Sequence, residues 1–276
     1  MSRKLPPNSR RSSAGKPLSE QLEERLWSAF LRVMRRLPYA LQARLFYGDI
    51  IGCSLDWSAT WILNLGSGEG RIAHQTNQRS KPHWVNLDLF LPYLRTCRIE
   101  VPDADCILAD AKHLPIKEKS FDVVMCLELI EHLAKIDGLR LIGEMQRIAR
   151  EQVIVSTPTR FHEVHIFDNN PLQIHRSGWS PAEFRRLAFK VRGTTGLRHL
   201  RGERAGSIFR HPFMKSLNSI LTYVTQVFTY FVPDLAWGMV CVKCASPRPA
   251  ESRTGRRGAA LQNSVNSDTP PLAGWN

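Results

Sequence analysis

Three absences limit what this 276-residue sequence can encode. No secretory h-region is present, and the most hydrophobic stretch, residues 216–231, is too rich in Asn, Ser, Thr and Gln to be a good membrane span. The motif Cys241-Val-Lys-Cys244 has no second CxxC partner, so a structural zinc site is not indicated. No internal repeat is visible. Together these absences favour a cytoplasmic protein whose six cysteines are reduced.

Positive charge is abundant but unevenly placed. The formal net charge is +13, yet residues 1–16 carry five basic residues and no acid, and residues 243–276 add a net +3. The two ends of the chain therefore supply eight of the thirteen charges. We expect solvated basic tails at 1–18 and 246–276, and a nucleic-acid partner is open but not favoured.

The middle of the chain alternates between strand-like and helix-like segments. An N-terminal helical addition is expected at 19–50, with one helix from Ser19 whose apolar stripe includes Val33 and a second at 39–47. Strands are expected at 61–65, 84–88, 105–109, 121–127, 152–156, 191–200 and 237–244, and helices at 137–149 and 180–189. This order predicts an α/β fold with a doubly wound, mostly parallel seven-stranded sheet over residues 51–245.

Residues 216–231, inside an expected helical insertion at 212–232, show a helical period. Their large apolar side chains form one stripe, and Asn218, Thr222 and Gln226 lie opposite. We expect the apolar stripe to face the core. The alternative is an interfacial or partner-binding helix that makes peripheral membrane contact, because the polar face carries no charge.

The segment LNLGSGEG, residues 63–70, packs three glycines directly after an apolar run. A dinucleotide fingerprint needs its third glycine one position later, and a P-loop needs GxxxxGK followed by Ser or Thr. Neither pattern fits, because the third glycine is Gly70 and no lysine follows. The acid at Glu69 favours a ligand with a cationic group.

Carboxylates follow the next two expected strands. Asp88 ends the strand WVNLD, where an acid accepts hydrogen bonds from the two hydroxyls of a ribose. Asp110 follows the third strand, where a carboxylate can accept from an adenine amino group. Because parallel strands present their carboxyl ends at one edge of a sheet, the sequence predicts a nucleoside site there.

The motifs LNLGSGEG, VNLD, ADAKHLPIKEKSFDVVMCLELIEHL and VIVSTP resemble the class I S-adenosylmethionine-dependent methyltransferases, in particular the type 11 group. The family usually has Asp where this chain has Asn64, and often Cys where it has Ser67. The resemblance implies S-adenosyl-L-methionine as cofactor. The residues it implies are Asn64, Gly66, Ser67, Gly68 and Gly70 along the methionine and sugar, Asp88 and Leu89 at the ribose, Asp110 and Ala111 at the adenine, and Cys126 and Leu127 beneath the methionine.

Catalytic candidates lie in the segment CLELIEHL. Methyl transfer from a sulfonium requires positioned reactants and, for a hydroxyl acceptor, removal of a proton. Glu128, Glu131 and His132 are spaced i, i+3 and i+4, so on a helix they share one face. His132 is the best candidate base, with Glu131 beside it, because imidazole titrates near neutrality. Alternatively, Glu131 and His132 only shape the strand-to-helix turn.

A metal-dependent alternative uses the same residues. Two carboxylates and an imidazole can ligate a divalent cation, with His165 or His175 closing the site. The ExxEH element is similar to the metal-binding element of small-RNA 2′-O-methyltransferases, but similar patterns occur in metal-independent relatives. We expect no metal, and a site of Glu128, Glu131, His132 and His175 is the alternative.

The acceptor site is expected in residues 157–179, where histidines, arginines and aromatic residues gather. Glu128, Arg160, His175 and Trp179 are the expected substrate contacts, and the arginines suit an anionic acceptor. The sequence thus predicts an enzyme that methylates a small-molecule or lipid-linked acceptor at oxygen. RNA methylation and a non-catalytic nucleoside-binding adaptor of the same fold are the alternatives, and the oligomeric state is not indicated.

Overall fold

The computed structural model describes residues 25, 28–30, 32–77, 82–164, 169–202, 207–209 and 212–244. The predicted tails, the predicted cap at Ser19 and the candidate ligand His165 lie outside the described residues.

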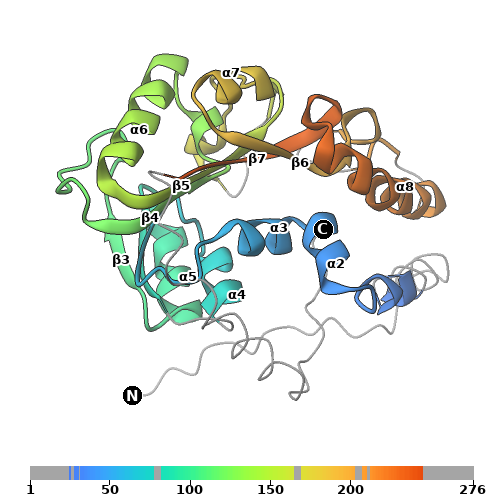
Figure 1. The fold of residues 1–276 in the computed structure, drawn as a ribbon, viewed down its shortest axis with the longest axis horizontal. Coiled ribbons are helices and arrows are strands. Elements are labelled where there is room, and N and C mark those ends of the chain that lie inside the picture. The colour runs from blue at the N-terminus through green and yellow to red at the C-terminus, as the bar shows by residue number, and fades with distance from the viewer. Residues whose placement is uncertain are drawn as a thin grey trace, which may run out of the picture.

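A seven-stranded sheet in the order β3-β2-β1-β4-β5-β7-β6 forms the centre of the protein (Figure 1). Strands β1 to β5 pair in parallel, and β7 runs antiparallel to both β5 and β6. The strands are β1 (Trp61–Leu65), β2 (His83–Asp88), β3 (Asp105–Leu108), β4 (Phe121–Leu127), β5 (Ala149–Pro158), β6 (Lys190–Leu197) and β7 (Ala236–Cys244). This arrangement confirms the predicted class I methyltransferase fold, with each predicted strand in place.

Helices cover both faces of the sheet. On one face lie α3 (Tyr47–Ser54), α4 (Arg71–Asn77) and α5 (Leu91–Glu100), and on the other lie α6 (Lys135–Ile148) and α7 (Pro181–Arg186) (Figure 1). The central strand β4 alternates between them. Val124 and Cys126 join the core beneath α6, whereas Val123 and Met125 join the core beneath α3 to α5. A strand buried on both faces needs apolar residues at every position, which explains the run VVMC.

The helix predicted at 180–189 is present as α7, and a capping box at Ser180 begins it. The Ser180 hydroxyl accepts a hydrogen bond from the Glu183 amide at 3.3 Å, and a Glu183 carboxylate oxygen accepts one from the Ser180 amide at 2.8 Å. The CxxC pair, in contrast, consists of two free thiols in β7, with Cys241 buried and Cys244 exposed at the end of the strand.

The N-terminal helices differ from the prediction in two ways. The predicted helix at 39–47 is two helices, α2 (Tyr39–Leu45) and α3, so the predicted domain boundary at residue 50 falls inside α3. Ile50 and Ile51 of α3 are almost completely buried in the sheet core. In the preceding helical segment, Val33 of the predicted apolar stripe is 61% exposed.

The long helix α8 (Pro212–Phe231) has the orientation opposite to the one expected. Its polar side faces inward: Asn218, Thr222, Gln226 and Thr229 are at most 2% exposed. Its large apolar side chains face outward, so the prediction of a core-facing apolar stripe is wrong. Among the described residues, no helix is both long enough and apolar enough to cross a membrane.

Hydrogen bonds to strand β6 explain this orientation. β6 is the last strand of the sheet, and no strand of the described residues pairs with its outer side. The side-chain amide of Gln226 forms hydrogen bonds with this edge. Its oxygen accepts from the Gly196 amide at 2.7 Å, and its nitrogen donates to the Gly193 carbonyl at 3.0 Å. Thr225 accepts from the Leu197 amide at 3.2 Å. The polar side of α8 thus pairs the backbone of an edge strand, which would otherwise be an aggregation hazard.

Two glycines let the helix come this close. A Cβ at Gly193 would lie 2.0 Å from the carbonyl oxygen of Thr229, and one at Gly196 would lie 2.5 Å from Thr222. Gly196 also has a positive φ of 69°, which disfavours any other residue.

We predict that Gly193→Ala lowers the free energy of unfolding by about 1–3 kcal/mol, the range for overpacking, because the methyl group collides with the α8 backbone. Gly143→Ala in α6 is the matched control, since nothing lies within 4 Å of the added methyl group. The control should be neutral or slightly stabilising because alanine favours a helix over glycine. Urea unfolding of both variants tests this, and equal stabilities would contradict the packing of α8 on β6.

Candidate active site at the carboxyl ends of the strands

The glycine segment forms the turn between β1 and α4. Gly66, Gly68 and Gly70 have φ values of 65°, 55° and 76°, a region that glycine enters without steric cost. The amides of Gly66 and Ser67 both donate to the Leu87 carbonyl of β2, at 2.8 and 3.0 Å. The turn is therefore fastened to the end of the next strand.

Asp88 lies beside this turn at the end of β2. Its carboxylate accepts from the Gly68 amide and from the Phe90 amide, each at 2.8 Å. Burial raises the pKa of Asp88, and these two amides oppose the shift by stabilising the charged form. Each oxygen keeps a further lone pair for a ligand.

Asp110 occupies the corresponding position after β3. One oxygen accepts from the Lys112 amide at 2.9 Å, and the other lies 3.6 Å from the Lys112 ammonium. Its side chain is partly exposed, so the carboxylate is accessible.

These residues fit the cofactor that the sequence implies. A Cβ on Gly68 would meet nothing within 4 Å, so this part of the turn is open to a ligand. The Ser67 hydroxyl is buried and has no hydrogen-bond partner among the described residues. Leu89 is 47% exposed and leaves an apolar surface beside Asp88. Gly68, Ser67, Asp88, Leu89 and Asp110 are therefore the residues that would hold a nucleoside here.

Four other predicted cofactor residues are buried in the interior of the protein. The Asn64 amide donates to Asn86 of β2 at 3.0 Å inside the sheet. Gly70 is buried, because a Cβ there would lie 2.5 Å from the Cys97 sulfur of α5. The side chains of Ala111 and Cys126 are buried in the core cluster beneath α6. Only the backbone of these two residues, and of Leu127 at the end of β4, remains for a cofactor contact.

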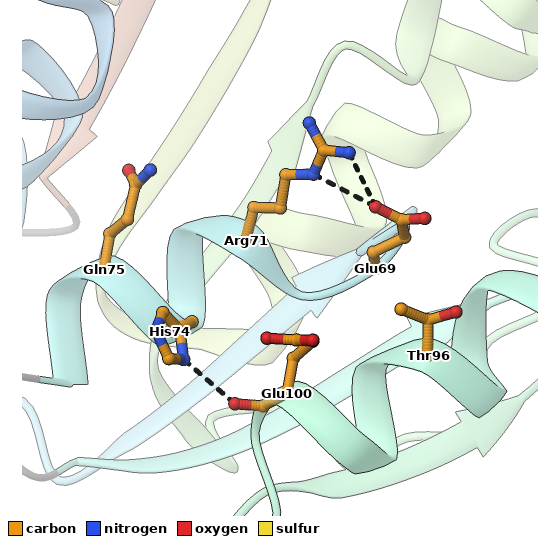
Figure 2. Close-up of a pocket in the computed structure, with 6 residues that line it drawn as sticks. All are labelled: Glu69, Arg71, His74, Gln75, Thr96 and Glu100. Atoms are coloured by element: carbon orange, nitrogen blue, oxygen red, sulfur yellow. Dashed lines mark hydrogen bonds and ion pairs between the residues drawn. The ribbon is translucent and has the colours of Figure 1, made fainter. Parts of the chain in front are cut away.

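The acid of the glycine segment does not face this site. Glu69 pairs with Arg71 at 2.7 Å in a hollow between α4 and α5 (Figure 2). The residues that line the hollow are Glu69, Arg71, His74, Gln75, Thr96 and Glu100, and Glu69 is the one among them for which the sequence suggested a ligand. The expectation that Glu69 favours a cationic ligand therefore has no support in the geometry.

The ExxEH segment is not an α-helix, contrary to the expectation. Glu128 has a positive φ of 51°, a conformation that is costly for a residue with a side chain and that gathers at functional sites. A single 3₁₀ turn, η1 (Ile130–His132), follows. Glu128 and Glu131 thus approach each other through a tight bend after β4 rather than along one helical face.

A hydrogen-bond chain connects Glu128 to the N-terminal helices. The Tyr47 hydroxyl of α3 lies 2.6 Å from the Ser156 hydroxyl of β5, which donates to Glu128 at 2.8 Å. Burial and the nearby Glu128 carboxylate raise the pKa of Tyr47, so its phenol stays protonated and donates. Sequence reasoning missed Tyr47 and Ser156. The position of Ser156 at the end of a predicted strand was a usable signal, whereas nothing local indicated Tyr47.

Glu131 is the most enclosed carboxyl group of the site. It is 2% exposed, and its Oε2 atom has no hydrogen-bond partner among the described residues. Burial, followed by the charge of Glu128, raises its pKa well above the usual range. Burial also raises the pKa of Glu128, and the hydrogen bond from Ser156 opposes that shift.

Two imidazoles adjoin Glu131. The rings of His132 and His175 are 4.9 Å apart, and the ligand atoms of Glu131, His132 and His175 all lie within 4.8 Å of one another. Burial, together with repulsion from His175, lowers the pKa of His132 to about 4. Its Nδ1 lies 3.3 Å from the Ile174 carbonyl, and the backbone of Gln173 and of Glu128 also interacts with the imidazole.

The expected acceptor segment is held against η1. The amides of Arg176 and Ser177 donate to the Glu131 carbonyl at 2.7 and 3.0 Å. Arg160 is exposed just after β5. Trp179, however, is 1% exposed and packs against Gly138 of α6, so its predicted role as a substrate contact is wrong.

Comparison with known proteins matches the part of the chain that contains the glycine turn, Asp88, Asp110 and the ExxEH segment. Residues 63–156 match the family model described as a methyltransferase domain. The chain thus contains a methyltransferase domain over these residues, an enzyme domain whose cofactor is S-adenosylmethionine.

A curated relative, an uncharacterized protein of Methanocaldococcus jannaschii, is 26% identical over 134 residues, which is 47% of this chain and 55% of the relative. The match therefore spans about half the length of that relative.

Two solved structures have low sequence identity to the chain. Magnesium protoporphyrin IX methyltransferase of Synechocystis is 13% identical, with a TM-score of 0.45 over 85% of this chain and 100% of that one. A sarcosine dimethylglycine methyltransferase described from Galdieria sulphuraria is 12% identical, with a TM-score of 0.49 over 76% and 86%. At these sequence identities and TM-scores, neither structure indicates which acceptor this chain methylates.

We predict that Asp88→Ala weakens binding of S-adenosylhomocysteine by about 1.5–3 kcal/mol, the scale of hydrogen bonds to a charged group. The control is Asp103→Ala, which removes an exposed carboxylate from the loop before β3, near the amino end of that strand rather than the carboxyl end. Isothermal titration calorimetry of both variants checks the assignment, and an unchanged affinity for Asp88→Ala would refute the role of this carboxylate at the ribose.

Proposed function

We propose that the protein transfers the methyl group of S-adenosylmethionine to an oxygen atom of a small-molecule or lipid-linked acceptor. The observation that supports this is the state of His132. Its imidazole is neutral at physiological pH and can accept a proton, at the same edge of the sheet as Asp88 and Asp110. A hydroxyl acceptor needs such a group.

When bound, the cofactor supplies an activated methyl group. The chain supplies position and a proton acceptor. Asp88 and Asp110 hold the nucleoside, and Gly68 permits its close approach. The His132 imidazole takes the proton of the acceptor hydroxyl. The Glu131 carboxyl group, whose pKa is raised by burial, lies beside it with its ligand atom within 4.8 Å.

A weak base is sufficient for this reaction. As the new carbon–oxygen bond forms, the acceptor oxygen gains positive charge and its proton becomes strongly acidic. A group with a pKa of about 4 then accepts that proton readily. The same group remains unprotonated, and therefore ready, over the whole physiological pH range.

The surroundings favour an anionic acceptor. Arg160 and Arg176 are exposed on the segment that follows β5. The His162 ring stacks on the Trp237 ring, with their centroids 5.1 Å apart. Burial, followed by the charges of His175 and Arg160, lowers the pKa of His162. A phosphate or carboxylate on the acceptor complements these groups. The six cysteines form no disulfide within the described residues, which supports the cytoplasm as the place of the reaction.

A methyl-transfer screen tests the acceptor class. Purified protein is incubated with labelled S-adenosylmethionine and with separated lipid, small-molecule and RNA fractions. We expect label in the lipid or small-molecule fraction and none in RNA. Label confined to RNA would overturn the proposal.

We predict that His132→Ala lowers kcat by about 10²–10⁴-fold with the labelled acceptor, the usual contribution of a general base. In the wild type, kcat/KM should be constant between about pH 5.5 and pH 8, because a base with a pKa of about 4 is deprotonated throughout. Activity should fall only at lower pH, as His132 is protonated. A loss of activity that begins well above pH 5.5 would instead assign the proton to Glu131, whose pKa is raised.

RNA 2′-O-methylation with a divalent cation is a second candidate function. It is favoured by the proximity of the ligand atoms of Glu131, His132 and His175. A neutral imidazole is also the form that binds metal. Glu128, the fourth residue of the predicted set, does not belong to this cluster and instead accepts from Ser156.

We predict that EDTA leaves turnover unchanged, because the proposed reaction uses an imidazole base and no ion. The measurement is the methyl-transfer rate after dialysis against EDTA, with Mn²⁺ or Mg²⁺ added back to a parallel sample. A loss of activity that the cation restores would support the metal-dependent alternative.

A further inference from the structure

The outward side of α8 forms a continuous apolar surface, which we call the α8 apolar face. It consists of Leu217, Leu221, Val224, Val227, Phe228 and Phe231, which are 36–61% exposed. Their spacing places them along one side of the helix over its last four turns. Single exposed apolar residues are ordinary, but six on one helix are not.

The helix cannot bury this face by rotating. Gln226, Thr225 and Asn218 on its opposite side are committed to hydrogen bonds with β6 and with the Leu200 carbonyl. A rotation would leave the edge of the sheet without partners and place these amides in solvent. The outward position of the apolar face is therefore built into the fold.

The charge around this face has one sign. Residues 212–231 contain a single charged residue, Lys215, and no acid. At the other end of the helix, the Arg44 guanidinium lies 5.6 Å from the centre of the Phe231 ring, and the Arg192 guanidinium lies 5.4 Å from that of Tyr230. The acid that follows, Asp234, is paired with Arg185 at 2.9 Å.

We propose that α8 docks the protein on an anionic lipid surface. The apolar face enters the boundary between headgroups and acyl chains, and the arginines at its border contact lipid phosphates. A second copy of this chain is a poorer occupant, because it would bring the same arginines, in a chain of net charge +13, against each other. A bilayer that carries negative charge complements both features.

Docking would also bring the acceptor segment to the membrane. α8 continues through η5 (Pro233–Leu235) directly into β7, where Trp237 stacks on His162. The Thr159 hydroxyl also connects the acceptor segment to β7, because it donates a hydrogen bond to the Ala236 carbonyl at 2.6 Å. A lipid-linked acceptor would then be within reach, although this last step, unlike the docking itself, rests on the proposed function.

Vesicle cosedimentation of the full chain tests the docking surface. The vesicles are phosphatidylcholine alone or phosphatidylcholine with phosphatidylserine. We expect the wild type to bind the anionic vesicles and to lose affinity as salt is added. Val224→Glu/Phe228→Glu should weaken this binding by about tenfold or more, because two side chains that enter the lipid become charged. The matched control is Ile99→Glu/Ile136→Glu, which changes equally exposed residues of α5 and α6 and should bind as the wild type.

A second pair separates the arginines of this surface from positive charge elsewhere. Arg44→Gln/Arg192→Gln should weaken binding to anionic vesicles by about fivefold for each charge removed, whereas Arg95→Gln/Arg98→Gln on α5 should not. The melting temperatures of all variants verify that the fold is intact. The proposal is overturned if the wild type does not bind anionic vesicles or if the α8 variant binds as well as the wild type. The proposal is also overturned if sedimentation equilibrium shows that the wild type is a dimer and that Val224→Glu/Phe228→Glu is a monomer.

Discussion

Within the part of the chain that the structure describes, strand β6 has no neighbouring strand on its outer side, and the need of its backbone for hydrogen-bond partners governs much of this structure. The Gln226 amide meets that need by pairing with Gly193 and Gly196. The same amide donates to the Arg44 carbonyl at 3.0 Å, so it also fixes α2. One side chain thus connects the sheet edge, the long helix and the N-terminal helices, and it determines that the apolar side of α8 faces outward.

A similar constraint holds at the carboxyl ends of the strands. The backbone amide of Glu128 donates to the Ser156 carbonyl at 3.0 Å, which holds the residue at its positive φ. Ser156 in turn joins Tyr47 of α3 to the Glu128 carboxylate. The N-terminal helices are therefore part of the candidate active site rather than an addition beside it. Burial of Glu131 next to this chain and next to two imidazoles produces the shifted pKa values on which the proposed chemistry depends.

Local patterns predicted the sheet, the helix that begins after Ser180 and the positions of Asp88 and Asp110, because helix and strand periodicity and the edge rule for parallel sheets act over short stretches of sequence. They could not predict contacts that join distant residues, such as Tyr47 with Ser156 or the burial of Trp179 against Gly138. Periodicity also identified two faces of α8 without deciding which lies inside. The useful signal was the absence of charge on its polar face, because Asn, Thr and Gln can be buried when they are hydrogen-bonded and ionised residues cannot.

The two proposals constrain each other through the geometry of β7. The helix that would contact lipid ends five residues before Ala236, and β7 begins there beside the segment that carries Arg160 and His162. A small acceptor in free solution would give no reason for an apolar face so close to the acceptor segment. An acceptor with an anionic headgroup accounts for the exposed arginines and for the α8 apolar face at once, and a neutral His132 would remain an effective base even where anionic lipid lowers the local pH.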